Sequence, residues 1–397
     1  MTATHPVRQG LNLLDGGWYA DDPHEVWAWM RREAPVYYDE AADVWGLTRY
    51  DDIYAAEKDP VTFSSRRAPR PHGQPLPMMI SMDNPEHQRR RALVNRGFSP
   101  RRVGELEPVV AGLCRRIIDR ASESGSCDFV WDVAAPLPLM VIADLLGFDE
   151  AVHDDLLRWS DDLMRATTLD PSPEILHKGS EAMTAFRELQ LRVIAERRAH
   201  PRDDLISTLC VAEVGGHRLD DESIVNETLL ILIGGDETTR HVLSGGMVAL
   251  LEHPAQLEAL RSDPGRLAVA VEELLRWVSP VKNMARTLTR DLVLRGQHLH
   301  QGDQVLLFYP SANRDEAVFE RPDELDIGRA PNPHLAFGFG THFCLGAALA
   351  RLELRAMFHE VLTRWTELQL VPGVTLAARP SNFVSGLESL PVRFRNL

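Results

Sequence analysis

Residues 220–251 carry the longest helical apolar periodicity in the chain, and this segment limits the folds that the chain can adopt. The spacing predicts one extended helix over Asp220–Leu251. Shorter helical patterns follow at Leu267–Val278 and at 345–365, whereas residues 287–310 alternate as strands do. The order predicts a mainly α-helical protein with small β-sheets. No linker separates two parts, so we expect a single domain over residues 1–397.

Composition excludes several classes of protein. The formal net charge of −15 argues against nucleic-acid binding. The four cysteines form no CxxC pair, so we expect neither a disulfide scaffold nor a zinc site, and a reducing cytoplasm is the natural setting. The N-terminus lacks the apolar core of a signal peptide, and we see no hydrophobic run long enough for a membrane anchor.

A glycine-rich loop over residues 334–346 ends in a cysteine. Gly338, Gly340 and Gly346 allow tight turns and close approach to a flat molecule. Cys344 stands where a helical pattern starts, and a helix N-terminus favours the thiolate that a soft metal requires. A small buried thiol remains an alternative. A dinucleotide-binding turn is excluded because Phe343 stands where a third glycine is needed.

The long helix contains an unusual segment, Gly234-Gly235-Asp236-Glu237-Thr238. Two glycines inside a helix cost roughly 2 kcal/mol relative to alanine. Acids beside an apolar run are costly unless they are paired, and such broken rules often mark functional sites. A packing notch for a crossing helix would explain the glycines. It would not explain the acid next to the hydroxyl.

Two further pairs of polar residues at helical spacing are weak signals when each is taken alone. Glu273 and Arg276 are spaced i, i+3 and lie on one helix face, although such pairs are commonly solvated. His87 and Arg91 are spaced i, i+4 and suit a ligand that carries carboxylates, although surface charge is the alternative.

The loop Phe337-x-x-Gly340-x-His342-x-Cys344-x-Gly346 resembles the haem-binding signature of the cytochrome P-450 superfamily at every defining position. The resemblance implies haem b, held between a long oxygen-binding helix and the helix that follows the cysteine. It implies Cys344 as the axial thiolate, which favours cleavage of the O–O bond.

The other segments occur in the family's order. By resemblance, Glu237 is the acid and Thr238 the alcohol of a proton relay, while Gly234 and Gly235 make room for dioxygen. Glu273 and Arg276 resemble the family's structural ExxR pair, which Arg329 completes. The expected contacts to the haem and its propionates are His87, Arg91, Gly235, Arg286, His334, Phe337, His342, Cys344 and Gly346.

The length and the expected absence of an anchor resemble soluble bacterial members. Such enzymes take electrons from NAD(P)H through a ferredoxin reductase and a ferredoxin. A basic cluster could attract an acidic ferredoxin, or could equally be a solvated face. Its members are Arg89, Arg90, Arg96, Arg101 and Arg102.

Segments at 76–82, 227–241, 280–286 and 382–391 resemble actinobacterial steroid 26-monooxygenases, which oxidise the terminal methyl (C26/C27) of a cholesterol or cholestenone side chain. The predicted apolar pocket suits such a ligand, and would also suit a terpenoid, a fatty acid or a macrolide. Its residues are Met78, Met79, Ile80, Leu232, Ile233, Val281, Met284 and Val384. A peroxide-driven peroxygenase is disfavoured by the acid–alcohol pair. A non-catalytic haem protein is a further alternative.

Overall fold

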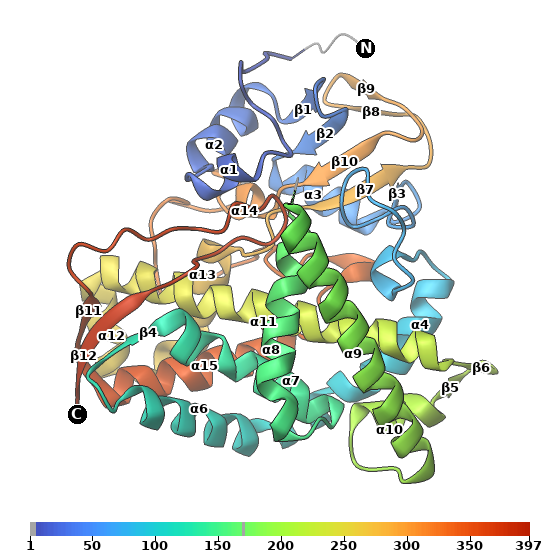
Figure 1. The fold of residues 1–397 in the computed structure, drawn as a ribbon. Coiled ribbons are helices and arrows are strands. Elements are labelled where there is room, and N and C mark those ends of the chain that lie inside the picture. The colour runs from blue at the N-terminus through green and yellow to red at the C-terminus, as the bar shows by residue number, and fades with distance from the viewer. Residues whose placement is uncertain (1–4, 169–170) are drawn as a thin grey trace. The chain divides into compact units, whose positions relative to one another are not determined.

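The computed structural model describes residues 5–168 and 171–397 and divides into two compact units (Figure 1). Unit 1 comprises Met1–Gln88, Glu272–Cys344 and Ala378–Gly386. Unit 2 comprises Arg89–Val271, Leu345–Ala377 and Leu387–Leu397. Two of the boundaries fall within helices, α4 (Glu86–Val94) and α13 (Leu267–Val278), and the others lie in loops.

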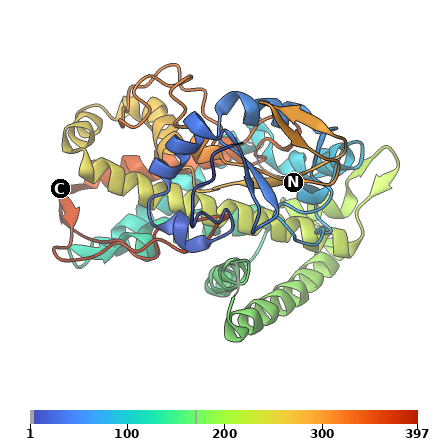
Figure 2. The same ribbon diagram turned by 90° about the horizontal axis from the view of Figure 1, so that it is seen from above.

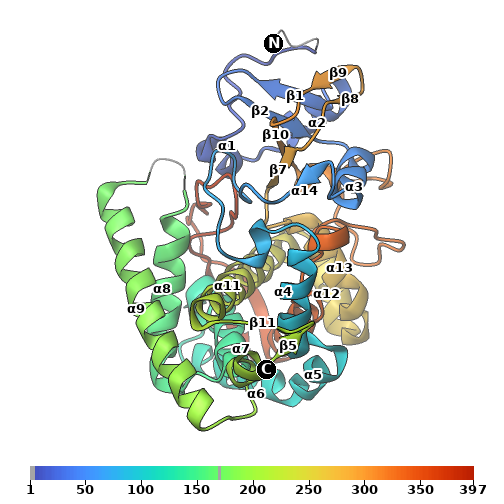
Figure 3. The same cartoon turned by 90° about the vertical axis from the view of Figure 1, so that its right-hand side faces the viewer.

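Unit 1 is built on a five-stranded sheet, visible in Figure 3. The strands in spatial order are β1 (Val36–Asp39), β2 (Val44–Leu47), β10 (Gln304–Leu307), β7 (Met284–Leu288) and β3 (Phe63–Ser64). β2 and β10 are parallel, and the other pairs are antiparallel. A hairpin of β8 (Leu292–Leu294) and β9 (Gln297–Leu299) turns at Arg295 and Gly296, which both have positive φ, as a type I′ turn requires.

Alternation along these strands gives unit 1 two apolar cores. Trp45 and Leu47 point into one core, whereas Val44 points into the other. Leu306 and Leu307 divide in the same way. The helices of this unit are α1 (Gly16–Ala20), α2 (His24–Glu33), α3 (Tyr50–Lys58), η1 (Met79–Ser81), α14 (Tyr309–Ala312) and η6 (Gly340–His342).

Unit 2 is helical and centres on α11 (Asp221–Glu252), whose N-cap Asp220 accepts from the backbone N–H of Ser223. α7 (Pro136–Leu146), α8 (His153–Arg165) and α15 (Ala347–Arg364) pack against α11. α8 lies beside α9 (Pro173–Ala199), and the two form the green pair in Figure 2. The remaining helices are η2 (Asn95–Phe98), α5 (Pro100–Glu105), α6 (Glu107–Ala121), η3 (Phe129–Ala134), η4 (Glu150–Val152), α10 (Leu205–Val211), α12 (Pro254–Ser262) and η5 (Pro264–Arg266).

Two small sheets complete unit 2. One contains β11 (Trp365–Leu370), β12 (Pro391–Asn396) and β4 (Ser126–Asp128), with β12 in the middle. The other pairs β5 (Glu213–Val214) with β6 (His217–Arg218). The prediction of a mainly helical chain with small sheets is therefore confirmed, as is the long helix. The single domain over residues 1–397 stays a prediction.

One long apolar segment, Phe129–Leu146, was not predicted from the sequence. Within the described residues, Phe129–Leu146 is long and apolar enough to cross a membrane, with 72 % of this 18-residue window buried inside the protein. Core helices pass the same test of length and composition.

Candidate active site

The loop before Cys344 folds against the end of α3 in unit 1. Gly338 and Gly340 have φ values of 64° and 67°, in the left-handed region that favours glycine. A Cβ at Gly340 would overlap the carbonyl oxygen of Glu57. The backbone N–H of Cys344 donates to the carbonyl of Phe337 over 2.9 Å. α15 begins only at Ala347, so the half-buried Cys344 precedes the helix and its N-cap.

Two of the predicted propionate ligands lie against each other. The rings of His87 and His342 have centroids 4.2 Å apart, although these residues are 255 positions apart in the chain. His87 is buried and lies in the first turn of α4. Arg91 follows one turn later on this helix and belongs to unit 2.

The other two predicted propionate ligands already have protein carboxylates as neighbours. Nη2 of Arg286 lies 3.3 Å from each carboxylate oxygen of Glu57. Nε2 of His334 lies 3.1 Å from Oε2 of Glu272. Burial alone would lower the pKa of Arg286, but the Glu57 carboxylate raises it above its ordinary value. Arg286 is therefore a cation, as a propionate ligand must be.

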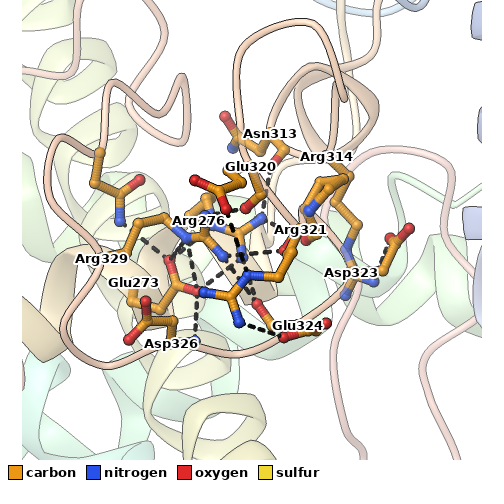
Figure 4. Close-up of polar contacts among 12 residues, drawn as sticks. Glu273, Arg276, Asn313, Arg314, Glu320, Arg321, Asp323, Glu324, Asp326 and Arg329 are labelled. Carbon is orange, nitrogen blue, oxygen red and sulfur yellow. Dashed lines mark hydrogen bonds and ion pairs between the residues drawn. The ribbon is translucent and has the colours of Figure 1, made fainter.

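The predicted Glu273–Arg276–Arg329 set forms a connected network (Figure 4). Arg329 Nε lies 3.1 Å from Glu273 Oε2, and Glu273 is fully buried. Arg276 also donates through Nη1 to the carbonyls of Asn313 (2.8 Å) and Pro322 (2.9 Å). The network thus ties α13 to the loop that precedes the cysteine segment.

Three residues at four-residue spacing, Leu230, Gly234 and Thr238, form a partly accessible face of α11. Leu230 and Thr238 are half-buried and Gly234 is exposed, and a Cβ at Gly234 would meet nothing within 4 Å. The Thr238 hydroxyl donates to the Gly234 carbonyl over 2.8 Å. Gly235 differs, because its Cβ would lie 2.8 Å from Ile142 of α7. The expected role of Gly235 beside dioxygen stays a prediction, and a glycine at this position also lets α7 approach α11 closely.

Glu237 lies on the buried side of α11 and joins a chain of ion pairs. Its carboxylate pairs with Arg240 and lies 3.2 Å from Nε2 of His241. Arg240 reaches Asp161 of α8 over 3.4 Å, and Asp161 pairs with Arg165 over 2.7 Å. Asp161 also lines a surface pocket of about 340 Å³ with Trp131, Asp154, Leu157, Arg158 and Asp162. The acid is thereby linked to the surface of unit 2.

Two further acids of unit 2, Asp236 and Glu353, are buried. Burial raises the pKa of Asp236 to about 7, although Arg240 acts in the opposite direction. Burial also raises the pKa of Glu353 on α15 well above its ordinary value, and Asp236 adds to this effect. Sequence reasoning missed Glu353, although an acid within the apolar run of α15 was the available signal.

Most of the residues predicted for the pocket belong to unit 1. Those in unit 1 are Met78, Met79, Ile80, Val281, Met284 and Val384, and among them Val281 bridges to Val384. In unit 2, Ile233 is half-buried, whereas Leu232 is fully buried on the opposite side of α11 from Gly234. The assignment of these residues to a substrate pocket stays a prediction.

The model of the cytochrome P-450 family matches residues 38–264 and 266–389, which is nearly the whole chain. The chain belongs to this family. It is a haem b oxidoreductase that incorporates oxygen into a hydrophobic substrate, with electrons from NAD(P)H through redox partners. The predicted family, cofactor and enzyme class are thereby confirmed.

Relatives of this P-450 cover nearly its full length. It is 48 % identical over 389 residues to a protein named steroid C26-monooxygenase from Mycolicibacterium smegmatis, covering 98 % of this chain and 97 % of the relative. It is 49 % identical over 386 residues to one of the same name from Mycobacterium tuberculosis, covering 97 % of each. The crystal structure of substrate-free CYP109E1 from Bacillus megaterium aligns with a TM-score of 0.89 at 34 % identity, covering 95 % and 99 % of the two chains.

The residues of unit 1 fit a haem. The Cys344 loop needs glycine at Gly340, and Cys344 is half-buried rather than enclosed. His87, His342 and Arg286, all within this unit, carry side-chain N–H groups of the kind that haem propionates accept.

The arginine cluster is less uniform than its sequence suggests. Arg90 lies 3.7 Å from the fully buried Glu227, so its charge faces inward. Arg102 pairs with Asp203 over 3.0 Å, and Arg101 pairs with Glu105 over 3.0 Å. Arg89 and Arg96 are exposed, and Arg96 donates to the carbonyl of Glu213 over 3.2 Å. Three of the five arginines therefore have an acidic neighbour, and Arg89 is an exposed cation on α4.

Proposed function

We propose that this P-450 hydroxylates the terminal methyl (C26/C27) of a cholesterol or cholestenone side chain. The observation that carries the proposal is the identity of 48 % and 49 % with two proteins named steroid C26-monooxygenase, across nearly the full length of each chain. The apolar side chains of the predicted pocket suit such a substrate. Because primary C–H bonds are the least reactive in the side chain, selectivity must come from positioning.

We propose that the Cys344 thiolate would hold the haem iron. The chemistry that haem would supply there is activation of dioxygen and insertion of one oxygen atom into the substrate, which a thiolate ligand favours. The hydrogen bond from the Cys344 N–H to Phe337 holds the cysteine in its loop. Gly346 caps the helix that follows. The proposed propionate ligands are His87, Arg91, Arg286, His334 and His342.

Glu237 and Thr238 are the proposed proton relay. Glu237 is held by Arg240 and His241 on the buried side of α11, and Thr238 lies on the accessible side. To pass a proton, the Thr238 hydroxyl must turn from the Gly234 carbonyl towards the substrate side. Glu237 must exchange an ion pair for a water molecule that reaches Thr238.

The proposed electron donor is a ferredoxin with its reductase. Arg89 gives α4 an exposed positive charge that favours an acidic partner. We place the protein in the cytoplasm, without a membrane anchor and as one functional domain. The few cysteines outside Cys344, with no pair spaced for a disulfide, support a reducing compartment.

The test is incubation of the holoprotein with cholestenone, NADPH and a competent ferredoxin system, followed by mass spectrometry of the product. We expect oxygen at the side-chain terminus, proceeding from alcohol towards carboxylic acid. Oxygen on the rings would contradict the proposal. So would turnover of a fatty acid, terpenoid or macrolide without sterol binding, although the protein would remain a monooxygenase.

A further inference from the structure

Glu57 at the end of α3 contacts two separate parts of unit 1. Its carboxylate faces Nη2 of Arg286 on β7, with both N···O distances 3.3 Å. Its carbonyl oxygen lies where a side chain on Gly340 would have to be. Gly340 is four residues before Cys344, so a single residue touches both the cysteine loop and a proposed propionate ligand.

The Glu57 carboxylate is enclosed and fully engaged. Glu57 is 5 % exposed, Arg286 6 % and Tyr309 4 %. The Tyr309 hydroxyl donates to Oε1 of Glu57. Burial raises the pKa of Tyr309 well above its ordinary value, and Glu57 adds to this effect, so the phenol keeps its proton and donates it. A carboxylate at this depth is stable only because Arg286 and Tyr309 compensate for lost hydration.

The guanidinium of Arg286 has more N–H donors than its contacts with Glu57 and Ala285 use. A guanidinium has five N–H groups in a fixed plane. Nη2 of Arg286 serves Glu57, and Nη1 donates to the Ala285 carbonyl over 2.9 Å. Both contacts hold the guanidinium plane in one orientation, and Tyr309 also lies within hydrogen-bonding reach of it. These contacts use fewer than five N–H groups, so a donor remains for a further acceptor. A planar fork that is fixed in advance loses less entropy when it binds a carboxylate.

We infer that Glu57 is a positioning residue for the haem: it orients Arg286 towards a propionate and sets the charge of this part of the site. The inference rests on the proposed role of Arg286. Glu57 adds a negative charge beside the guanidinium, in a region of low dielectric where charges are weakly screened. Removing this charge leaves Arg286 with its full positive charge and favours the reduced haem, which carries one more electron.

The test compares Glu57→Gln with Glu57→Asp and Asp51→Asn in holoprotein. Glutamine keeps the shape and removes the charge, whereas aspartate keeps the charge. Asp51 is an exposed acid on the same helix. We expect a positive shift of the haem reduction potential in Glu57→Gln, with faster haem transfer to apomyoglobin. Glu57→Asp and Asp51→Asn should retain the wild-type potential.

An unchanged potential in Glu57→Gln would overturn the inference. If Glu57→Gln gives no holoprotein, the Glu57→Asp variant decides. Holoprotein with the wild-type reduction potential supports the inference. Loss of haem in both variants overturns it, because the side chain then has a purely structural role. The Arg286→Lys variant tests separately the assumption that Arg286 binds a propionate. If the propionate bands of its resonance Raman spectrum match wild type, Arg286 does not bind a propionate and that part of the proposed function fails. If they shift while Glu57→Gln behaves as wild type, only the role of Glu57 fails.

Discussion

Glu273 and Arg276 meet in a two-point ion pair, with Nε to Oε2 and Nη2 to Oε1 both at 2.7 Å, and neither side chain is exposed. Leaving one member of such a pair alone in the interior costs roughly 3–5 kcal/mol. We therefore expect Glu273→Ala to give little or no holoprotein, measured by haem content and thermal unfolding. Glu320→Ala, at an acid whose side chain is 90 % exposed, is the control. Normal haem content in Glu273→Ala would refute the prediction.

Cys344→Ser should abolish the red-shifted Soret band of the reduced carbon-monoxide complex, because that band reports thiolate ligation. The matched control is Cys127→Ser. Burial raises the pKa of Cys127 to about 12, so this residue remains a thiol at neutral pH and its loss should leave the spectrum unchanged. A wild-type spectrum typical of histidine-ligated haem would show that the ligand is misassigned.

Thr238→Ala should retain substrate affinity but divert electrons to hydrogen peroxide, because the accessible hydroxyl on α11 is lost. The measurement is product formed and peroxide released per NAD(P)H consumed. Thr239→Ala, at the neighbouring but buried hydroxyl, should stay coupled. Equal coupling in Thr238→Ala and wild type would mean that water alone carries the proton.

Asp236 should make stability depend on pH. Its folded-state pKa of about 7 lies above the ordinary value of 3.8, so folding favours the protonated form. The associated stability is present below about pH 4 and is lost as pH rises towards 7. The groups around it are Ser160 and Asp161 on α8, Glu237 and Arg240 on α11, and Glu353 on α15.

We therefore expect the melting temperature of Asp236→Asn to exceed that of the wild type by a margin that grows between pH 5 and pH 8. The measurements are made at constant ionic strength. Asp154→Asn, at an exposed acid of α8, should show no such trend. A difference in melting temperature that does not vary with pH would mean that Asp236 is ionised throughout.

Arg89→Glu should slow reduction by ferredoxin and weaken its dependence on salt, because an exposed charge acts through long-range attraction. Arg90→Glu is unsuitable, since it would place a second carboxylate against Glu227. Arg158→Glu, at an exposed arginine of α8, is the control. Stopped-flow reduction rates that match wild type in both variants would favour the solvated-face interpretation. Substrate binding should remain unchanged in each.

The sequence predicted the elements well where periodicity was strong. The helix expected at Leu267–Val278 has those bounds, and the one expected at Asp220–Leu251 differs by one residue at each end. The Glu273–Arg276–Arg329 network was also predicted from a known motif. Its backbone acceptors Asn313 and Pro322 were not, because no pattern reveals which loop carbonyls a buried guanidinium will reach.

The sequence says least where one helix face must be distinguished from another. Leu232 and Leu230 are equally apolar, yet Leu232 is fully buried and Leu230 is half-buried. Gly235 and Gly234 are likewise equivalent in sequence, yet Ile142 touches only the former position. No sequence pattern indicated a role for Glu57, because its partners Arg286 and Tyr309 are more than 220 residues away in the chain.

The two faces of α11 make this segment sensitive to length rather than to composition alone. Leu230, Gly234 and Thr238 reach the accessible side because they are spaced by four, and each residue turns the helix by about 100°. Inserting a single residue after Gly234 would rotate everything downstream by that angle and carry Glu237 to where Thr238 now stands. Substitutions in this segment alter one group at a time, whereas a one-residue insertion would displace both the acid and the alcohol from their present faces of the helix at once.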